Sequence, residues 1–211
     1  MRGIADIIFT KEGVKMDKYG ELINCDELHY SKVTKDTEES YAAGTPAYLA
    51  PLAEISHQPT VNSNKRHYDG KVRYITTTES GTTVNITISG VPCSLAADLT
   101  GKPYDETKGM VYDTGDVSDA PWCTLSGRME LGDGGYRYYQ YLKGKFTLGA
   151  QTAHTREDGI TVNTATLTYE AAVTEHKFQV KTGKLSGAKA VTADTTDEKF
   201  TAAAQAAWFT K

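Results

Sequence analysis

Met129-Glu-Leu-Gly-Asp-Gly-Gly-Tyr-Arg-Tyr-Tyr-Gln-Tyr-Leu-Lys-Gly-Lys-Phe-Thr-Leu148 is the stretch of sequence that decides the fold class. Its Asp-Gly-Gly turn at residues 133–135 separates two extended runs, as in a β-hairpin. Successive side chains of a strand point to opposite faces. Strict alternation therefore gives one face with Tyr136, Tyr138, Gln140 and Leu142, and a second face with Arg137, Tyr139, Tyr141 and Lys143. Both faces are aromatic, which favours a strand at a subunit interface; an ordinary half-buried hairpin strand is the alternative.

Strand patterns also dominate the rest of the chain. Lys71–Ser80 and Thr82–Val91 are extended runs separated at Ser80-Gly81, which predicts a hairpin with its turn there. Apolar and polar residues alternate in the second run and again in Ile160–Val173. The polar faces of these two runs hold Thr83, Asn85, Thr87 and Ser89, and Thr164, Thr166, Thr168 and Glu170. We therefore expect a mainly β protein, a β-sandwich or partly closed barrel.

Two short helices are predicted. The first covers Ser94–Leu99, with Ser94 as its cap and with Gly101 and Pro103 ending it. The second covers Asp197–Ala207, because Thr195 and Glu198 have the spacing of a capping box. Its expected packing face consists of Phe200, Ala203, Ala204, Ala207 and Trp208.

The chain divides into three predicted parts: a β domain at residues 16–182, an extension with the second helix at 183–211, and a short leading segment. Lys11-Glu-Gly13 stands just before Met16 and is what a ribosome-binding sequence would encode if translated. Residues 1–15 are therefore interpreted as a leader from a start codon assigned too early, with a genuine N-terminal arm as the alternative. Two polar stretches, Pro51–Gly70 and Gln151–Gly159, are predicted to be functional loops or loops ordered by a partner.

Composition excludes several classes of protein. The net charge of −4 is unlike that of a dedicated nucleic-acid binder, and no apolar run reaches the length of a membrane helix. Cys25, Cys93 and Cys123 are odd in number and widely spread, which argues against a disulfide framework and fits a reducing cytoplasm. No catalytic motif is present, and the five histidines show no metal-binding spacing. We predict no catalytic, cofactor or metal site.

Several blocks of sequence appear in a familiar order. They are Leu28-His-Tyr-Ser-Lys-Val-Thr34, Tyr41-Ala-Ala-Gly-Thr-Pro46, Pro59-Thr-Val-Asn-Ser-Asn64, Tyr68-Asp-Gly70, Val91–Asp105, Gly109-Met-Val-Tyr112 and Gly135–Phe146. In order and spacing, these blocks resemble the major tail tube proteins of siphophages, the bacteriophages with long, non-contractile tails. The resemblance extends from about Leu28 to Val173, and it rests on collinearity because no single block is a chemical fingerprint.

This resemblance implies a structural virion protein and no enzyme. Such proteins form hexameric rings that stack into the tail tube, through which viral DNA passes into the host without sequence-specific binding. The implied partners are further copies of the chain, the tape measure protein, the tail terminator and the distal tail protein, with no membrane. The implied location is the virion tail, assembled in the bacterial cytoplasm. The tube of a phage-derived bacteriocin or injection particle would satisfy the same resemblance.

Site residues follow from combining this resemblance with the strand patterns. A duplex sliding through a tube needs a neutral or negative wall that does not trap phosphates. We predict that the polar faces line the lumen through Thr83, Asn85, Thr87, Ser89, Thr164, Thr166, Thr168 and Glu170. The Pro51–Gly70 segment would reach between subunits. Predicted contacts between subunits or rings are Val61, His67, Tyr68, Tyr139 and Tyr141.

Two other classes of function remain open from the sequence. A carbohydrate-binding or adhesion β-sandwich would use tyrosine-rich strands as a sugar platform, although the chain has no convincing export signal. A β-rich hydrolase with an unusual site would need convergent titratable groups, which the sequence does not offer.

Overall fold

The computed structural model describes residues 20–116, 118–151, 155 and 164–210. Its described part is mainly β, as predicted, with two short helices, α1 (Cys93–Thr100) and α2 (Ala202–Ala207). The strands in chain order are β1 (Leu22–Asp36), β2 (Tyr41–Ala43), β3 (Ala47–Tyr48), β4 (Leu52–Tyr68), β5 (Lys71–Ile88), β6 (Tyr104–Asp105), β7 (Met110–Val111), β8 (Cys123–Leu131), β9 (Tyr136–Leu148), β10 (Ala165–Ala171), β11 (Lys177–Lys181), β12 (Lys184–Gly187) and β13 (Ala190–Asp194).

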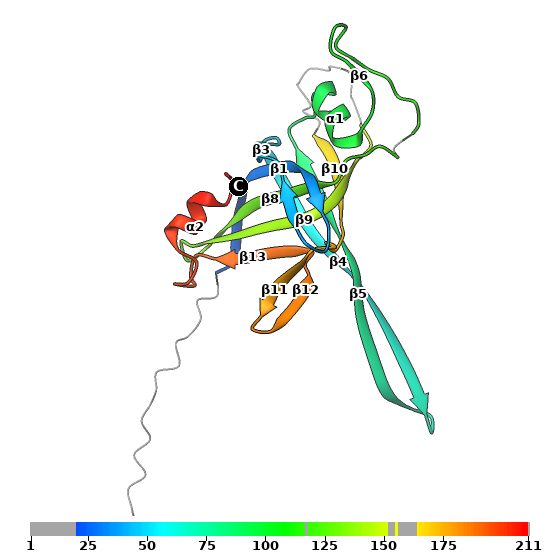
Figure 1. Ribbon diagram of the computed structural model, residues 1–211, viewed down its shortest axis with the longest axis vertical. Helices are drawn as coiled ribbons and strands as arrows, with labels where there is room; N and C mark the ends of the chain where they lie inside the picture. The colour runs from blue at the N-terminus through cyan, green and yellow to red at the C-terminus, as the bar shows by residue number, and fades with distance from the viewer. Residues whose placement is uncertain (1–19, 117, 152–154, 156–163, 211) are drawn as a thin grey trace, which may run out of the picture.

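One large antiparallel sheet carries most of these strands, in the order β2-β1-β8-β9-β10-β5-β4 (Figure 1). Strand β9 is its branch point. The first half of β9 pairs with β13 and the second half with β10, while β8 runs along its other edge. The sheet curls without closing into a barrel, because its terminal strand β4 pairs only with β5 among the described strands.

The concave side of the curled sheet holds the core. Val84, Ile86 and Ile88 of β5 are almost fully buried there, beside Leu167 and Tyr169 of β10, as the alternating pattern predicted. Leu28 of β1 and Leu125 of β8 are fully buried in the same core, and so is Leu99 of α1. Burial of this apolar surface is the main stabilising contribution.

A β-bulge in β9 corrects the predicted alternation of that strand. Cys123 lies opposite Gly144, but Leu125 lies opposite Tyr141, so β9 contains an extra residue between them. Such a bulge shifts the side chains that follow it to the other face. Tyr139 and Tyr141 therefore point into the core, whereas Lys143 does not share their face. The main-chain partner of β9 changes from β13 to β10 at the same place, where Leu142 N–H bonds to Lys189 and the Lys143 carbonyl accepts from Ala172.

The two predicted helices form with different boundaries. Helix α1 ends at Gly101 in the left-handed conformation, as expected, but Ser94 lies inside the helix and makes no cap. Helix α2 is capped by the Thr201 hydroxyl, which accepts from Ala204 N–H, so the capping box at Thr195 is wrong. Its anchors are the rings of Phe200 and Trp208, both against Tyr138, whereas Ala203 and Ala204 are exposed.

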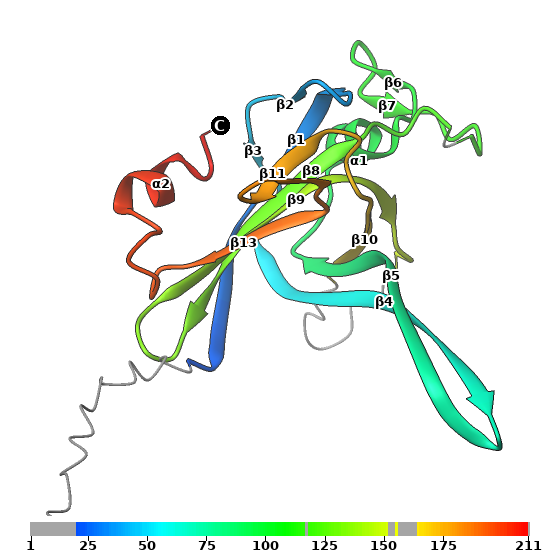
Figure 2. The same cartoon turned by 60° about the horizontal axis from the view of Figure 1, so that its bottom comes forward.

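The chain from Leu52 to Ile88 is one continuous hairpin, which corrects two predictions. Pro51–Gly70 is a strand and not an irregular loop, and the turn lies at Asp69-Gly70 and not at Ser80-Gly81. Both turn residues have positive φ, 51° and 72°, which fits a tight hairpin turn. The outer part of this hairpin, residues 59–82, projects far from the sheet in both views (Figures 1 and 2). We call it the arm.

The predicted extension at 183–211 contributes strand β13 to the large sheet, while its β12 forms a separate two-stranded sheet with β11. Its proposed boundary falls in the turn between β11 and β12, and β13 then pairs with β9 over five residues. The predicted leader at 1–15 and most of Gln151–Gly159 lie outside the described residues. No helix among the described residues has the length and apolar character needed to cross a membrane.

Candidate functional site

The convex side of the curled sheet carries a continuous polar surface over four strands. Residues paired across antiparallel strands lie on the same face. In β5 and β10 the pairs are Thr83 with Glu170, Asn85 with Thr168, and Thr87 with Thr166. The flanking strands add Gln58, Ser56 and Glu54 on one side, and Lys145 and Thr147 on the other. We call this surface the threonine face.

Six of the eight predicted lumen residues therefore share one surface within strands. Ser89 and Thr164 lie just beyond the ends of β5 and β10 and are exposed. The sequence had no signal for the contribution of β4 and β9, because their faces depend on register and on the bulge. The threonine face is consequently wider than predicted.

Charge on the threonine face is low and mixed. Glu170 accepts hydrogen bonds from the Thr83 hydroxyl at 3.0 Å through both of its carboxylate oxygens. Lys145 lies directly opposite Glu170 in the register with β9. Its ammonium lies 5.0 Å from the centre of the Trp122 ring, so a cation–π contact holds it at the border of this surface. The predicted lumen wall was expected to carry no lysine, so Lys145 on the threonine face differs from that prediction.

The arm holds three of the predicted inter-subunit residues. Val61 and Tyr68 are half exposed, and His67 is exposed. Further apolar side chains that the sequence analysis did not single out are Val72, Tyr74 and Ile75, at 45–65% exposure. The rings of Tyr68 and Tyr74 touch edge to face with centroids 5.9 Å apart. An arm with apolar side chains on solvent and no covering element is a candidate for contact with another molecule.

Tyr139 and Tyr141, the other two predicted inter-subunit residues, are buried within this subunit. Only 5% and 7% of their surfaces are exposed, at the wall of the groove described below, and their predicted contact with a neighbouring copy stays a prediction. Both rings pack against His57 of β4, which shares a 2.8 Å hydrogen bond between its Nδ1 and the Tyr141 hydroxyl. Burial lowers the pKa of His57 and raises the pKa of Tyr141 to about 12, so both groups are neutral near pH 7.

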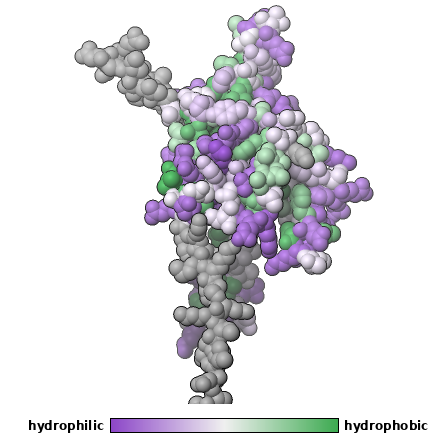
Figure 3. All heavy atoms as spheres, turned by 90° about the vertical axis from the view of Figure 1, so that its left-hand side faces the viewer, coloured by the Kyte–Doolittle hydropathy of each residue, from purple (hydrophilic) through white to green (hydrophobic). Residues whose placement is uncertain are grey.

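A long groove opens beside these rings, with a volume of about 1950 Å³. Its walls come from β1, β4, β9, β13 and the segment that leads to α2. Leu22 and Ile23 of β1 line it with exposures of 54% and 61%. Its charged residues are Glu54, Arg137, Asp194, Asp197, Glu198 and Lys199. Seen from the side that carries α2, apolar residues form separate patches between polar ones (Figure 3).

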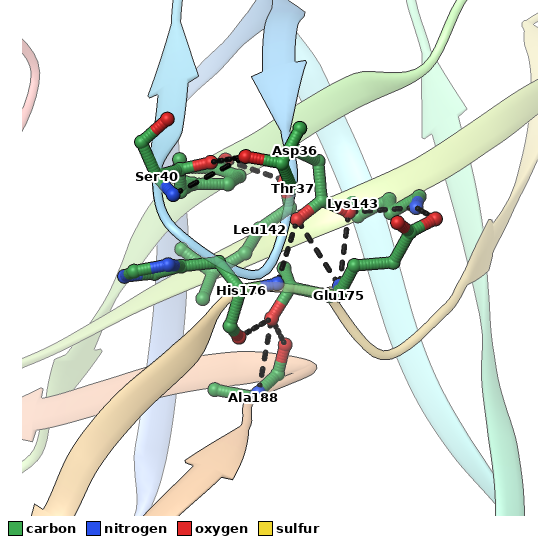
Figure 4. A network of polar contacts seen from close by, with 10 residues as sticks. Asp36, Thr37, Ser40, Leu142, Lys143, Glu175, His176 and Ala188 are labelled. Atoms are coloured by element: carbon green, nitrogen blue, oxygen red, sulfur yellow. Dashed lines mark hydrogen bonds and ion pairs between the residues drawn. The ribbon is translucent and has the colours of Figure 1, made fainter.

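A buried ion pair secures the branch point of the sheet. Lys143 donates to the Asp36 carboxylate at 2.7 Å, and the same carboxylate accepts the backbone N–H groups of Glu175 and His176 (Figure 4). Burial opposes ionisation of Asp36, but these hydrogen bonds outweigh it and lower the pKa of its carboxyl group. The network ties the β1–β2 turn to β9 and to the segment after β10, so it supports the sheet and faces no site.

Within the part of the chain that the structure describes, no three His, Cys, Asp or Glu side chains gather closely enough to hold a metal ion. Asp113, in the loop after β7, forms an ion pair with Lys102 at 2.7 Å. The candidate functional surfaces are the threonine face, the arm and the groove.

No family model matches the chain, and a search of curated proteins finds no match.

Proposed function

We propose that this chain is the building block of a bacteriophage tail tube, in which six copies form a ring and stacked rings form the conduit for DNA ejection. The collinear blocks between Leu28 and Val173 support the family. The observation that carries the proposal is the pairing of two features in one subunit: a broad hydroxylated sheet face, and an arm whose residues from Pro59 to Ser80 are all exposed and which the described residues contact through an ion pair between Lys189 and Glu79.

The threonine face suits a wall along which DNA slides. Duplex DNA carries one negative charge per about 1.7 Å, and clustered lysine or arginine side chains would hold it. Here threonine hydroxyls dominate, Glu54 and Glu170 add negative charge, and Lys145 is paired in register with Glu170. A hydrated surface of this kind offers few attractive contacts to phosphates. Backing by the buried residues of β5 and β10 keeps the wall rigid.

The arm suits assembly because a two-stranded ribbon is marginally stable on its own in water. All residues from Pro59 to Ser80 are exposed, so the ribbon buries no core of its own. Contact with a neighbouring copy would cover its apolar side chains and add the stability that the isolated ribbon lacks. Assembly and ordering of the arm are then one event.

The experiment that tests this function removes the arm without disturbing the sheet. Val61 lies opposite Glu79, so deleting Asn62–Thr78 and joining the ends through Asn-Gly shortens both strands in register. A deletion of Asn62–His67 alone would leave residues 72–78 of β5 without their β4 partners and is a poorer design. Electron microscopy of the purified intact chain should show rings or tubes, and the shortened chain should stay a folded monomer with the same circular dichroism.

Two results would contradict the proposal. Monomers of the intact chain under all assembly conditions would speak against a tube subunit. Normal tubes from the shortened chain would show that the arm is dispensable. A matched control replaces Asp69-Gly70 by Asn-Gly, which keeps the arm at full length and should leave assembly unchanged.

A further inference from the structure

The groove is bounded by strand edges that have no partner. Among the described strands, β4 pairs only with β5 and β13 pairs only with β9. The groove is lined by Ala53, Glu54, Ile55 and His57 of β4 and by residues 192–194 of β13. Their outer N–H and C=O groups are therefore open to an added strand, the arrangement used in β-augmentation. Leu22, Ile23 and Ile55 supply apolar surface beside these edges.

Charge distinguishes the groove from the arm. The groove carries four carboxylates and two cations, a net charge of −2, and Arg137 already binds Asp194 through two hydrogen bonds of 2.7 and 2.8 Å. The tip of the arm, residues 65–73, carries four cations and one carboxylate, a net charge of +3 with His67 neutral. The four cations are Lys65, Arg66, Lys71 and Arg73. Opposite net charges of this size favour encounter and fix orientation.

Shape and chemistry also agree. Among the described strands, the tip is a ribbon with free outer edges; it exposes Tyr68 and Val72, and Tyr74 and Ile75 follow directly after it. Such a ribbon offers main-chain groups to the edges of β4 or β13 and apolar side chains to Leu22 and Ile23. The arm therefore offers the groove three things together: main-chain groups for its free strand edges, apolar side chains for Leu22 and Ile23, and a positive charge for its carboxylates.

A subunit cannot fill its own groove with its own arm. Strand β4 contributes Ala53–His57 to the groove and continues directly into the arm. The hydrogen-bonded ladder with β5 runs from Leu52 to Tyr68, interrupted only by local register shifts. Folding the tip back onto residues 53–57 would break this ladder, so the occupant must come from another copy.

We propose that the groove between β1, β4 and β13 receives the tip of the arm, residues 65–73, from a second copy of this chain. This inference rests on the proposed assembly and adds the receiving site and the charges that select it. The basic tip lies against the acidic rim of the groove, and the ribbon pairs with a free edge of the sheet.

Cross-linking in assembled tubes tests the site directly, because Cys25 lines the groove. In a chain with Cys93→Ser, which removes the exposed thiol, His67→Cys places a new thiol on the exposed tip. A short bis-maleimide should then link copies into covalent multimers. The multimers should disappear with Cys25→Ser, and they should not form with Thr182→Cys, which is exposed on the β11–β12 turn.

A charge exchange provides a second, independent test. Lys65→Glu/Lys71→Glu should raise the protein concentration needed for assembly at least about tenfold, because like charges would then meet. Adding Asp197→Lys in the groove should restore part of that loss. The control Lys181→Glu/Lys184→Glu changes the same charge on the exposed β11–β12 hairpin and should have little effect.

The outcomes separate this inference from the proposed function. If the intact chain forms no rings or tubes, both fail. If tubes form but the His67→Cys links are absent or do not depend on Cys25, the groove assignment alone is overturned. Tubes that tolerate Lys65→Glu/Lys71→Glu while the arm loses affinity for DNA would also overturn it, since the basic tip would then serve nucleic acid.

Discussion

The Tyr169 ring packs directly on the backbone of Gly144, at the position where β9 changes partners. The Tyr169 hydroxyl reaches past this glycine and donates to the Cys123 carbonyl at 2.8 Å. A side chain at residue 144 would overlap the ring, so β8, β9 and β10 can approach closely only because this residue is glycine.

Gly144→Ala should therefore destabilise the fold by about 1–3 kcal/mol, the usual cost of forcing an extra methyl group into a packed core. The midpoint of urea denaturation measures this loss. Gly90→Ala is the matched control, because nothing lies within 4 Å of its added methyl group and its φ is not positive. Equal stability of the two variants would mean that the Tyr169 ring moves aside without cost.

The Asp36 carboxylate should make stability depend on acid. Its pKa is lowered in the folded state, so its contribution is complete above the unfolded value of about 4 and is lost as the pH falls through the folded value. Asp36→Asn should cost about 2 kcal/mol at pH 7, the usual worth of a hydrogen bond to a charged group. Lys143 would lose its carboxylate partner at 2.7 Å and would keep the Glu175 carboxylate at 3.7 Å and the Trp122 ring at 4.8 Å. The substitution should also flatten the decline of stability below pH 4.

Urea denaturation between pH 2.5 and 7 checks this prediction. Glu39→Gln is the control, because Glu39 is exposed in the same turn. An unchanged acid profile in Asp36→Asn would show that the buried pair does not govern the acid sensitivity of this chain.

His57 should add a second pH dependence, at higher pH. Burial lowers the pKa of His57, so the folded chain resists the proton that the unfolded chain accepts near pH 6.5. Stability should fall as the pH drops below about 6.5, until the folded pKa is reached. His57→Phe keeps the ring against Tyr139 and Tyr141 and should remove this slope between pH 5 and 7.

The control for this pH dependence is His67→Gln, because His67 is exposed on the arm and its loss should leave the slope unchanged. If His57→Phe retains the slope of the unaltered chain, the titrating group lies elsewhere.

The threonine face makes a prediction about DNA passage. Thr87 and Thr166 are direct neighbours across β5 and β10, so Thr87→Lys/Thr166→Lys would place two ammonium groups side by side on this face. Six copies would then add twelve positive charges to each ring. Tubes should assemble, because the buried face of both strands is unchanged, but genome ejection should become slower, most strongly at low salt.

Gln179→Lys/Thr182→Lys is the matched control, with the same added charge on the exposed β11–β12 hairpin. Ejection of the Thr87→Lys/Thr166→Lys phage at the control rate at every ionic strength would place the threonine face outside the lumen.

Local sequence pattern determined the elements that bury one face. Thr82–Ile88 and Ala165–Ala171 alternate strictly, and the polar side chains of one are paired with those of the other as the pattern indicated. The sequence also predicted the end of helix α1, because Gly101 ends it in a conformation that favours glycine. These features depend on residues a few positions apart, so the sequence alone contains them.

Tertiary structure decided the rest. The sequence predicted Lys71–Ser80 as an extended run, but residues 59–68 bury no face and show no alternation that would identify them as its partner strand. The bulge near Lys143, the burial of Tyr139 and Tyr141, and the position of α2 all depend on which distant strand pairs with β9. The groove lies beside the edges of β4 and β13 that have no partner among the described strands. Pairing between residues far apart in the chain sets these features, and periodicity along the chain carries no record of it.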